Sequence, residues 1–288
     1  MSHPGSRLRA LLAAPGTVMA PGAFNAMSAK LAQESGFQAL YVPGGGTALA
    51  QYGVADLGLL TLNEMVANAG AIAQAVTLPV IADADTGFGN ALNVQRTVRD
   101  YERAGLAAIH IEDQEFPKRC GFFEGKKLIP LPEAANKIRA AVAARQHPDF
   151  MIIARCDAMS VGGMAEVKAR AAAYLAAGAD MLFIEGGTGG DEMRNLPREV
   201  PGVHVFNMSA SGKMPLLSAQ EVGDLGYKLM IFPNFATLSA LQAIRETYRR
   251  IAQDQSIENL GPLCASFADF TALGGMAEFR HLERTFGV

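Results

Sequence analysis

The chain has 288 residues, of which half are apolar and 18% are charged. Its length suits one large domain, and a formal net charge of −3 excludes a protein that binds nucleic acid through excess positive charge. Three cysteines cannot form a disulfide framework, and no apolar run has the ~18 residues of a membrane-spanning helix, so we expect a cytoplasmic protein that contacts no membrane.

Eight short apolar runs, rich in β-branched residues, predict eight strands. Segments with helical periodicity separate them, which indicates parallel strands joined by helices. The predicted strands are Val18–Phe24, Ala39–Pro43, Pro79–Asp85, Ala108–Asp113, Met151–Asp157, Met181–Glu185, His204–Met208 and Leu229–Pro233. The clearest predicted helices are Leu62–Val76, Val94–Ala104, Pro132–Arg145, Met164–Ala177 and Ala236–Ile251.

Four of these strands follow a glycine that is placed to end a helix: Gly36, Gly105, Gly178 and Gly226. Such a glycine supplies the left-handed turn that reverses the chain. Eight units of this kind predict an α/β fold of the closed (β/α)₈ TIM type, with an open doubly wound sheet as the alternative. The glycine-rich run 44–46 lacks the spacing of dinucleotide-binding sites, which favours the barrel.

The segment 254–288 lies beyond the eighth unit, and we interpret it as a C-terminal helical extension of one catalytic domain that spans residues 1–288. Apolar residues recur in it at roughly helical spacing. They would pack either on the helices of their own barrel or against another subunit.

Acidic residues gather where the third and fourth predicted strands end. Asp83 and Asp85 are two residues apart, so in a strand their side chains would face the same way. Glu112 ends the next strand, and in such barrels the reactive groups lie at the carboxyl ends of the strands. Three carboxylates suit a hard cation such as Mg²⁺. The alternative is that these acids are exposed loop residues.

The next loop reads Lys118-Arg119-Cys120-Gly121. Two cations beside a thiol favour its reactive thiolate form, and the same cations can bind an anionic substrate. A buried, unreactive cysteine is the alternative interpretation.

Polar residues also end the fifth, sixth and seventh strands, where Arg155, Glu185 and Asn207 lie. A guanidinium at a barrel mouth can bind a carboxylate in a bidentate manner. Arg155 could equally be held by Asp157 or Glu185 in a structural ion network. Asn207 could be no more than a polar strand end.

The second strand contains Tyr41 and is followed by Gly44, Gly45 and Gly46. Bare backbone N–H groups at such a run could bind an oxyanion. A tight turn between strand and helix is the alternative for these glycines.

Taken in order, these segments resemble the isocitrate lyase/phosphoenolpyruvate mutase superfamily, and within it the branch of 2-methylisocitrate lyase, 2,3-dimethylmalate lyase and carboxyphosphonoenolpyruvate mutase. The resemblance covers roughly residues 11–288. It is carried by D-A-D-T-G-F-G-N at 83–90, I-E-D-Q at 111–114, K-R-C-G at 118–121, A-R-C-D at 154–157 and L-G-Y-K-L-M-I-F-P at 225–233.

The resemblance implies a Mg²⁺-dependent carbon–carbon lyase, with Mn²⁺ as a possible substitute. Its substrate would be a small 2-hydroxy di- or tricarboxylate, such as a 2-alkylmalate or a methylisocitrate-like acid, cleaved to a 2-oxo acid such as pyruvate and a carboxylate. A phosphonomutase, or a hydrolase or decarboxylase of an oxo acid, is the catalytic alternative. A binding protein without activity is a further one. The family barrel exchanges its terminal helix between subunits, commonly in homotetramers.

The resemblance also implies individual roles. Asp83, Asp85 and Glu112 would hold the metal, partly through water, with Asp56 nearby on a lid. Cys120 would be the catalytic acid/base on a gating loop. The group that takes the hydroxyl proton stays open between Tyr41, Glu185 and a metal-bound hydroxide. The implied substrate pocket comprises Gly44, Gly45, Lys118, Arg119, Gly121, Phe122, Arg155 and Asn207.

The chain departs from the lyase pattern at four positions. Phe122 stands where the lyases continue with histidine, and Pro43 stands at a serine position. Ala210 and Met214 replace an acidic residue and a threonine. Each change removes hydrogen-bonding capacity, and a site without those groups suits a substrate that lacks their partner. We therefore expect a less polar substrate arm than the carboxymethyl group of methylisocitrate.

Overall fold

The computed structural model describes residues 2–121, 125–186, 190–211 and 216–287. It divides into two compact units, Met1–Thr237 and Leu238–Val288. The second unit therefore begins before residue 254, where we expected the extension to start. Within the described ranges, no helix is long and apolar enough to cross a membrane.

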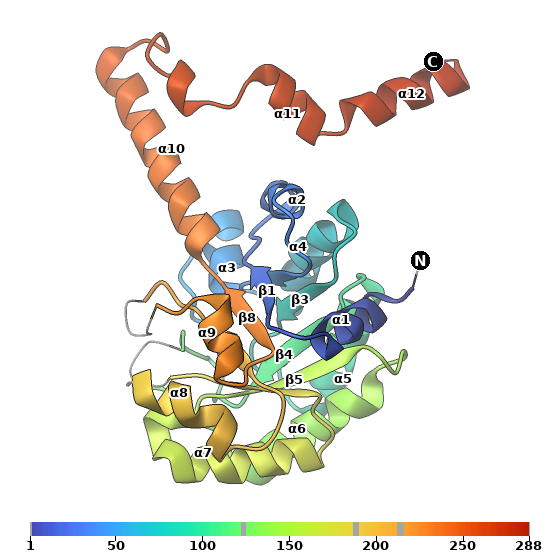
Figure 1. Ribbon diagram of the computed structural model, residues 1–288, viewed down its shortest axis with the longest axis vertical. Coiled ribbons are helices and arrows are strands. Elements are labelled where there is room, and N and C mark those ends of the chain that lie inside the picture. Colours follow the sequence, from blue (N-terminus) through green and yellow to red (C-terminus); the bar gives the residue numbers. More distant parts are fainter. Residues whose placement is uncertain (1, 122–124, 187–189, 212–215, 288) are drawn as a thin grey trace. The chain divides into compact units, whose positions relative to one another are not determined.

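In the described part of the first unit, eight strands pair in parallel, and Figure 1 shows strands at the centre of this unit with helices around them. Hydrogen bonds order the strands as β2-β3-β4-β5-β6 and as β1-β8-β7. The bridges Gly22–Tyr41 and Leu182–His204 join the two groups, which confirms the predicted barrel. The strands are β1 (Val18–Pro21), β2 (Leu40–Val42), β3 (Val80–Asp83), β4 (Ala108–Glu112), β5 (Met151–Cys156), β6 (Met181–Ile184), β7 (Val205–Asn207) and β8 (Leu229–Phe232).

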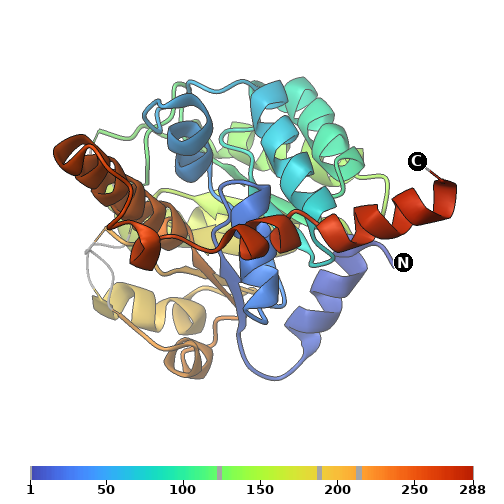
Figure 2. The ribbon, with the colours of Figure 1, turned by 90° about the horizontal axis from the view of Figure 1, so that it is seen from above.

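Helices surround these strands, as the view from above shows (Figure 2). They are α1 (Pro4–Ala13), α2 (Ala26–Glu34), α3 (Gly44–Tyr52), α4 (Leu62–Ala75), α5 (Ala91–Arg103), α6 (Leu131–Ala144), α7 (Met159–Ala176), α8 (Gly190–Glu199) and α9 (Ala219–Asp224). The four predicted turn glycines all have a positive φ, from 85° at Gly36 to 102° at Gly226. Only glycine adopts this conformation at little cost, which confirms their predicted role.

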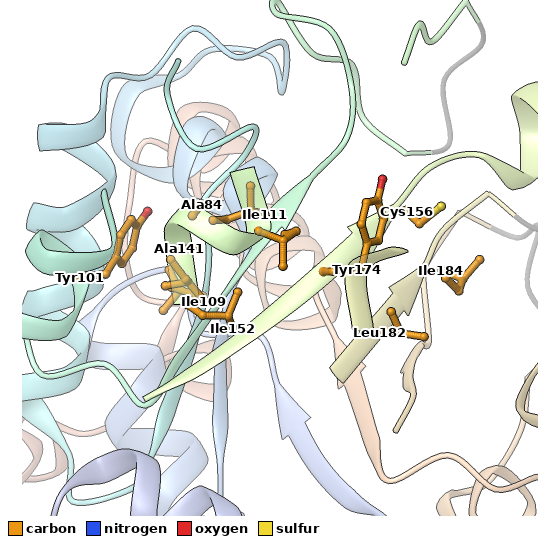
Figure 3. Close-up of a cluster of buried hydrophobic side chains, with 14 of the residues drawn as sticks. Ala84, Tyr101, Ile109, Ile111, Ala141, Ile152, Cys156, Tyr174, Leu182 and Ile184 are labelled. Carbon is orange, nitrogen blue, oxygen red and sulfur yellow. The ribbon is translucent and has the colours of Figure 1, made fainter. Parts of the chain in front are cut away.

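Alternation along each strand separates the barrel interior from the layer beneath the helices. Ile109 and Ile111 of β4 belong to the outer core, and Figure 3 shows Ile109 beside Ala141 of α6. His110 lies between these two isoleucines in the chain and Glu112 follows them, so the side chains of His110 and Glu112 face the barrel interior. The same alternation turns Tyr41, Asp83, Arg155, Glu185 and Asn207 inward.

The second unit contains most of α10 (Phe235–Asp254), a short 3₁₀ helix (Gly261–Leu263), α11 (Phe267–Leu273) and α12 (Met276–Phe286). The predicted helical spacing of this tail is confirmed. Neither α11 nor α12 has a buried residue, although Phe267 and Phe270 are among their side chains. An exposed apolar surface of this kind is typical of a segment that packs against another surface.

Candidate active site

Polar residues from five strand ends meet at the carboxyl end of the barrel. Asp83 lies opposite His110 in the β3–β4 register, and Glu112 lies opposite Arg155 in the β4–β5 register. Asp83, Glu112 and Arg155 are all buried, as are Glu185 of the β6 end and Asn207 of β7. The alternative interpretation, that these acids are exposed loop residues, is therefore wrong for Asp83 and Glu112.

Asp85 reaches this mouth by a different route from the one we expected. Strand β3 ends at Asp83, and Asp85 lies beyond it with a left-handed φ of 45°. Its backbone N–H donates to Asp83 Oδ1 over 2.9 Å. A Cβ atom on Gly44 would lie 2.6 Å from Asp83 Oδ2 and 3.5 Å from Asp85 Oδ1, so both carboxylates face the start of α3. A tight turn, and not strand alternation, brings them together.

Lys118 lies among these acids, where we had predicted a substrate contact. Its ammonium forms an ion pair with Asp56 and another, 2.9 Å long, with Asp85. Burial alone would lower the pKa of Lys118, but the carboxylates of Asp85 and Glu112 outweigh it and raise the pKa well above its usual range. In this structure Lys118 therefore binds two of the acids that were assigned to the metal. Asp56 also contacts Gly45, where a Cβ atom would meet its Oδ2 at 3.2 Å.

Glu112 provides a test of whether this site fits a cation. Both its carboxylate oxygens are buried without a hydrogen bond, and Oε2 lies 3.2 Å from Arg155 Nε. A buried carboxylate with so few donors is what a missing cation would leave. Among the described residues, no three His, Cys, Asp or Glu side chains come close enough to enclose an ion. Mg²⁺ keeps several waters and needs only one or two carboxylates, so the residues fit a hydrated ion.

Arg155 is held from behind by a buried ion network, one of the two arrangements we considered. Its Nε and a terminal nitrogen donate to Asp157 over 3.0 and 3.3 Å. The guanidinium also lies 5.3 Å above the ring of Phe183. These contacts fix its plane, which is the condition for bidentate binding of an anion. Binding of the substrate by Arg155 stays a prediction.

Glu185 and Tyr41, two candidates for the proton acceptor, lie in different surroundings. Glu185 accepts hydrogen bonds from Asn207 over 2.7 Å and from the N–H of Gly186 over 3.1 Å, and burial raises its pKa. The hydroxyl of Tyr41 is 2.8 Å from His110 Nε2 inside the barrel, and burial raises its pKa well above its usual range. Because a buried phenol of this kind does not ionise readily, Glu185 is the better base.

The segment Lys118–Gly121 crosses this mouth. A Cβ atom on Gly121 would lie 2.5 Å from Glu185 Cγ and 2.7 Å from a terminal nitrogen of Arg155, so only glycine fits there. The side chain of Gln114 holds the backbone of Arg119 through two hydrogen bonds, of 2.9 and 3.0 Å. Gln114 belongs to the I-E-D-Q motif, yet sequence reasoning gave it no role.

The structure describes two of the four departures from the lyase pattern. Pro43 is buried at the start of α3, and Ala210 is exposed. Phe122 and Met214 lie outside the described residues. Of the two departures that the structure describes, only Pro43 is therefore buried, next to Gly44, whose Cβ position faces Asp83 and Asp85.

A second buried network lies behind the mouth, between β4, β5 and α7. Asp113 accepts hydrogen bonds from the hydroxyl of Tyr174 over 2.6 Å and from Arg170 over 3.1 Å. Its other oxygen accepts the N–H of Asp157 over 2.9 Å. The second acid of I-E-D-Q thus positions the residue that holds Arg155, as second-layer hydrogen bonds do in many sites.

Comparison with known proteins agrees with this arrangement. The phosphoenolpyruvate phosphomutase family model matches residues 8–252, and the chain belongs to the phosphoenolpyruvate mutase/isocitrate lyase superfamily. A 2,3-dimethylmalate lyase of Eubacterium barkeri is 42% identical over 98% of this chain and 97% of its own. A 2-methylisocitrate lyase of Shewanella oneidensis is 40% identical over the same shares. The crystal structure of a phosphonopyruvate hydrolase with oxalate and Mg²⁺ has a TM-score of 0.90 and 34% identity, over 98% of this chain and 99% of that one.

Proposed function

We propose that this protein is a Mg²⁺-dependent carbon–carbon lyase that cleaves a 2-alkylmalate, of the 2,3-dimethylmalate type, into a 2-oxo acid and a carboxylate. One observation carries the proposal: Gly121, the residue after Cys120, lies directly against Arg155 and Glu185 at a mouth lined by buried carboxylates. A guanidinium and a candidate base thus lie beside the residue that follows the thiol. The lyase names of the relatives support the same reaction class.

The metal would be held by Asp83, Asp85 and Glu112, some of them through water molecules that complete its shell. When bound, Mg²⁺ would bind the hydroxyl and carboxylate of the substrate and stabilise negative charge on the hydroxyl oxygen. Lys118 would then give up its contact with Asp85 and keep its contact with Asp56. The Mg²⁺ in the related hydrolase structure supports this choice of ion.

The side chains can supply both proton transfers. Glu185 takes the proton of the C2 hydroxyl, a carbonyl forms at C2, and the C2–C3 bond breaks with its electron pair left on C3. Arg155 offsets the negative charge that spreads from C3 into the adjoining carboxylate. The thiol of Cys120 donates its proton to C3, and solvent later restores it while Glu185 loses its proton. The products are a 2-oxo acid and a saturated carboxylate.

The preference for an alkyl-substituted substrate rests on Pro43. Proline has no side-chain donor and no N–H, so the start of α3 offers nothing polar at this position. A carboxymethyl arm would lose hydrogen bonds with water and gain none there, whereas a methyl group would lose nothing. This favours dimethylmalate over methylisocitrate.

The proposal is tested by a panel of acids with and without Mg²⁺. We expect release of a 2-oxo acid from 2,3-dimethylmalate and 2-alkylmalates, at rates well above those for methylisocitrate. Faster turnover of phosphonopyruvate or oxaloacetate would assign the protein to a mutase or hydrolase instead. Binding of Mg²⁺ and oxalate without any turnover would favour a protein that has lost activity.

We further propose a homo-oligomer, commonly a tetramer in this superfamily, in which the C-terminal extension packs on a neighbouring subunit. The exposed phenylalanines of α11 and α12 support this, because a stable protein seldom leaves so many aromatic rings in water without a partner surface. Sedimentation of the full chain and of a variant truncated after Asp254 would test it. A cytoplasmic location stays a prediction.

Replacing Gly121 with alanine should disturb the site without affecting the fold. The new methyl group would meet Glu185 and Arg155 at 2.5 and 2.7 Å, so the loop or both side chains must shift. We expect kcat/KM to fall by about 10²-fold, as displacements near 1 Å commonly do. The control is Gly261→Ala, where nothing lies within 4 Å of the added atom. Equal activity of the two variants would contradict the placement of Gly121.

A further inference from the structure

Lys126 has a buried ammonium for which neither the sequence nor the reaction gives a use. It follows the K-R-C-G segment in the loop between β4 and α6. Its Nζ donates to the carbonyl of Gly121 over 2.6 Å and to Asp157 Oδ1 over 3.0 Å. The side chain is 2% exposed, whereas the neighbouring Lys127 is exposed to solvent. A lysine loses much rotamer entropy on burial, so it is seldom buried without a specific partner.

The partner on the barrel side is a fixed anion. Asp157 is fully buried, and it binds Arg155 through both its oxygens. Burial alone would raise the pKa of Asp157, but the charges of Arg155 and Lys126 outweigh this and hold the pKa at about 2. The carboxylate is therefore ionised whenever the protein is folded near neutral pH. It serves as an anchor for two cations at once.

The partner on the loop side is the residue that follows the thiol. Holding the carbonyl of Gly121 fixes the backbone of the residue that follows Cys120. The space around the ammonium is also restricted, since a Cβ atom on Gly186 would lie 3.0 Å from Lys126 Nζ. Lys126 thus links the Cys120–Gly121 backbone to the same carboxylate that orients Arg155.

We propose that Lys126 is a positioning residue for Cys120, because its ammonium ties the Gly121 carbonyl to Asp157 and so fixes the backbone of the residue next to the thiol. This rests on the proposed function of Cys120 as the proton donor. Proton transfer to carbon requires the donor to be held within a few tenths of an ångström of its productive position. An unclamped segment would leave the thiol present but wrongly placed.

The test compares Lys126→Met with Lys127→Met, a neighbouring lysine that is exposed. We expect Lys126→Met to lower kcat by about 10²-fold, with KM and the affinity for Mg²⁺ and oxalate nearly unchanged. Lys127→Met should behave as the wild type. Lys126→Arg keeps the charge and should retain more activity than Lys126→Met, which covers the case in which the methionine variant folds poorly.

A second readout does not depend on turnover. Alkylation of Cys120 by iodoacetamide, followed by mass spectrometry, reports how firmly the segment is held, and the exposed Cys264 gives an internal reference in the same sample. With Mg²⁺ and oxalate present, we expect the alkylation rate of Cys120 in Lys126→Met to rise about tenfold relative to that of Cys264. A segment that has lost its hydrogen bond to Lys126 opens locally more often.

An unchanged alkylation ratio, or a kcat equal to that of Lys127→Met, would overturn the proposal. A Lys126→Met variant with a lower melting temperature but unchanged kcat would also overturn it. Failure of the proposed function looks different: the wild type would release no 2-oxo acid from any substrate. The alkylation ratio would still report whether Lys126 holds the segment around Gly121.

Discussion

Replacing Asp85 with alanine or asparagine is expected to abolish metal-dependent cleavage. Asp85 is 6% exposed and has its carboxylate at the mouth beside Asp83. Burial, together with the charge of Asp83, raises its pKa to about 6 even though Lys118 is close, so the ionised carboxylate is costly here without a further cation. We expect a divalent ion to stabilise the ionised form and to contribute several kcal/mol to cleavage, so kcat should fall about 10³-fold or more.

The asparagine variant separates loss of charge from loss of packing. Asparagine keeps the size of the side chain and an oxygen that can accept from Lys118, yet it removes the charge that a cation needs. Titration calorimetry with Mg²⁺ and oxalate should show no binding in either variant. Asp224→Ala, an exposed site at the end of α9, is the control and should bind as the wild type does. Activity that survives exhaustive chelation of the wild type would rule out the metal.

The fold could be predicted from the sequence because its signals are local. A turn glycine at Gly105 or Gly226 needs a left-handed conformation whatever the rest of the chain does. Alternation fixes which strand residues face inward, so Glu112 and Arg155 could be assigned to one mouth from their positions in the sequence alone. The strand ends were less well predicted, since all eight strands are shorter than the apolar runs that indicated them. The last residue of each run lies beyond the end of its strand.

The site was predicted less completely because charge partners are set by tertiary structure. Lys118 was read as a substrate contact from its neighbours in the chain, but its partners Asp56 and Asp85 come from other loops. Likewise Lys126 is 31 residues from Asp157, and no short motif connects them. Asp85 reached the predicted place through a left-handed turn that an aspartate rarely adopts, which strand periodicity cannot indicate.

Tyr41 shows how the interior changes a residue's role. The sequence places it at the end of a strand beside glycines, which suits a catalytic phenol. In the barrel its hydroxyl pairs with His110, and the two rings stack with their centroids 5.7 Å apart. The pairing joins residues 69 positions apart, so only the closed barrel reveals it. We therefore favour Glu185 as the base, since burial raises its pKa and a raised pKa suits a group that must take up a proton and release it.

Replacing Cys120 with serine should lower turnover severely and leave the fold and the affinity for Mg²⁺ nearly intact. Cys120 is partly exposed and is not among the core residues, so the substitution creates no cavity. A serine hydroxyl occupies nearly the same place but is a far weaker acid, and loss of a general acid typically costs about 10²–10⁴-fold in rate. The measurement is release of the 2-oxo acid, with calorimetry of Mg²⁺ and oxalate on the same samples.

Cys264→Ser supplies the matched control, because Cys264 is exposed in the second unit and the same atom is exchanged. It should keep full activity. In deuterium oxide the wild type should place one deuterium on the former C3 of the substrate, which is the α-carbon of the carboxylate product, delivered from the thiol to one face of that carbon. If Cys120→Ser retained wild-type turnover with the same stereochemistry, the proton would come from another group. A variant that still takes up the hydroxyl proton but protonates C3 slowly and on both faces would establish Cys120 as the donor, because solvent water, unlike a positioned thiol, does not distinguish the two faces.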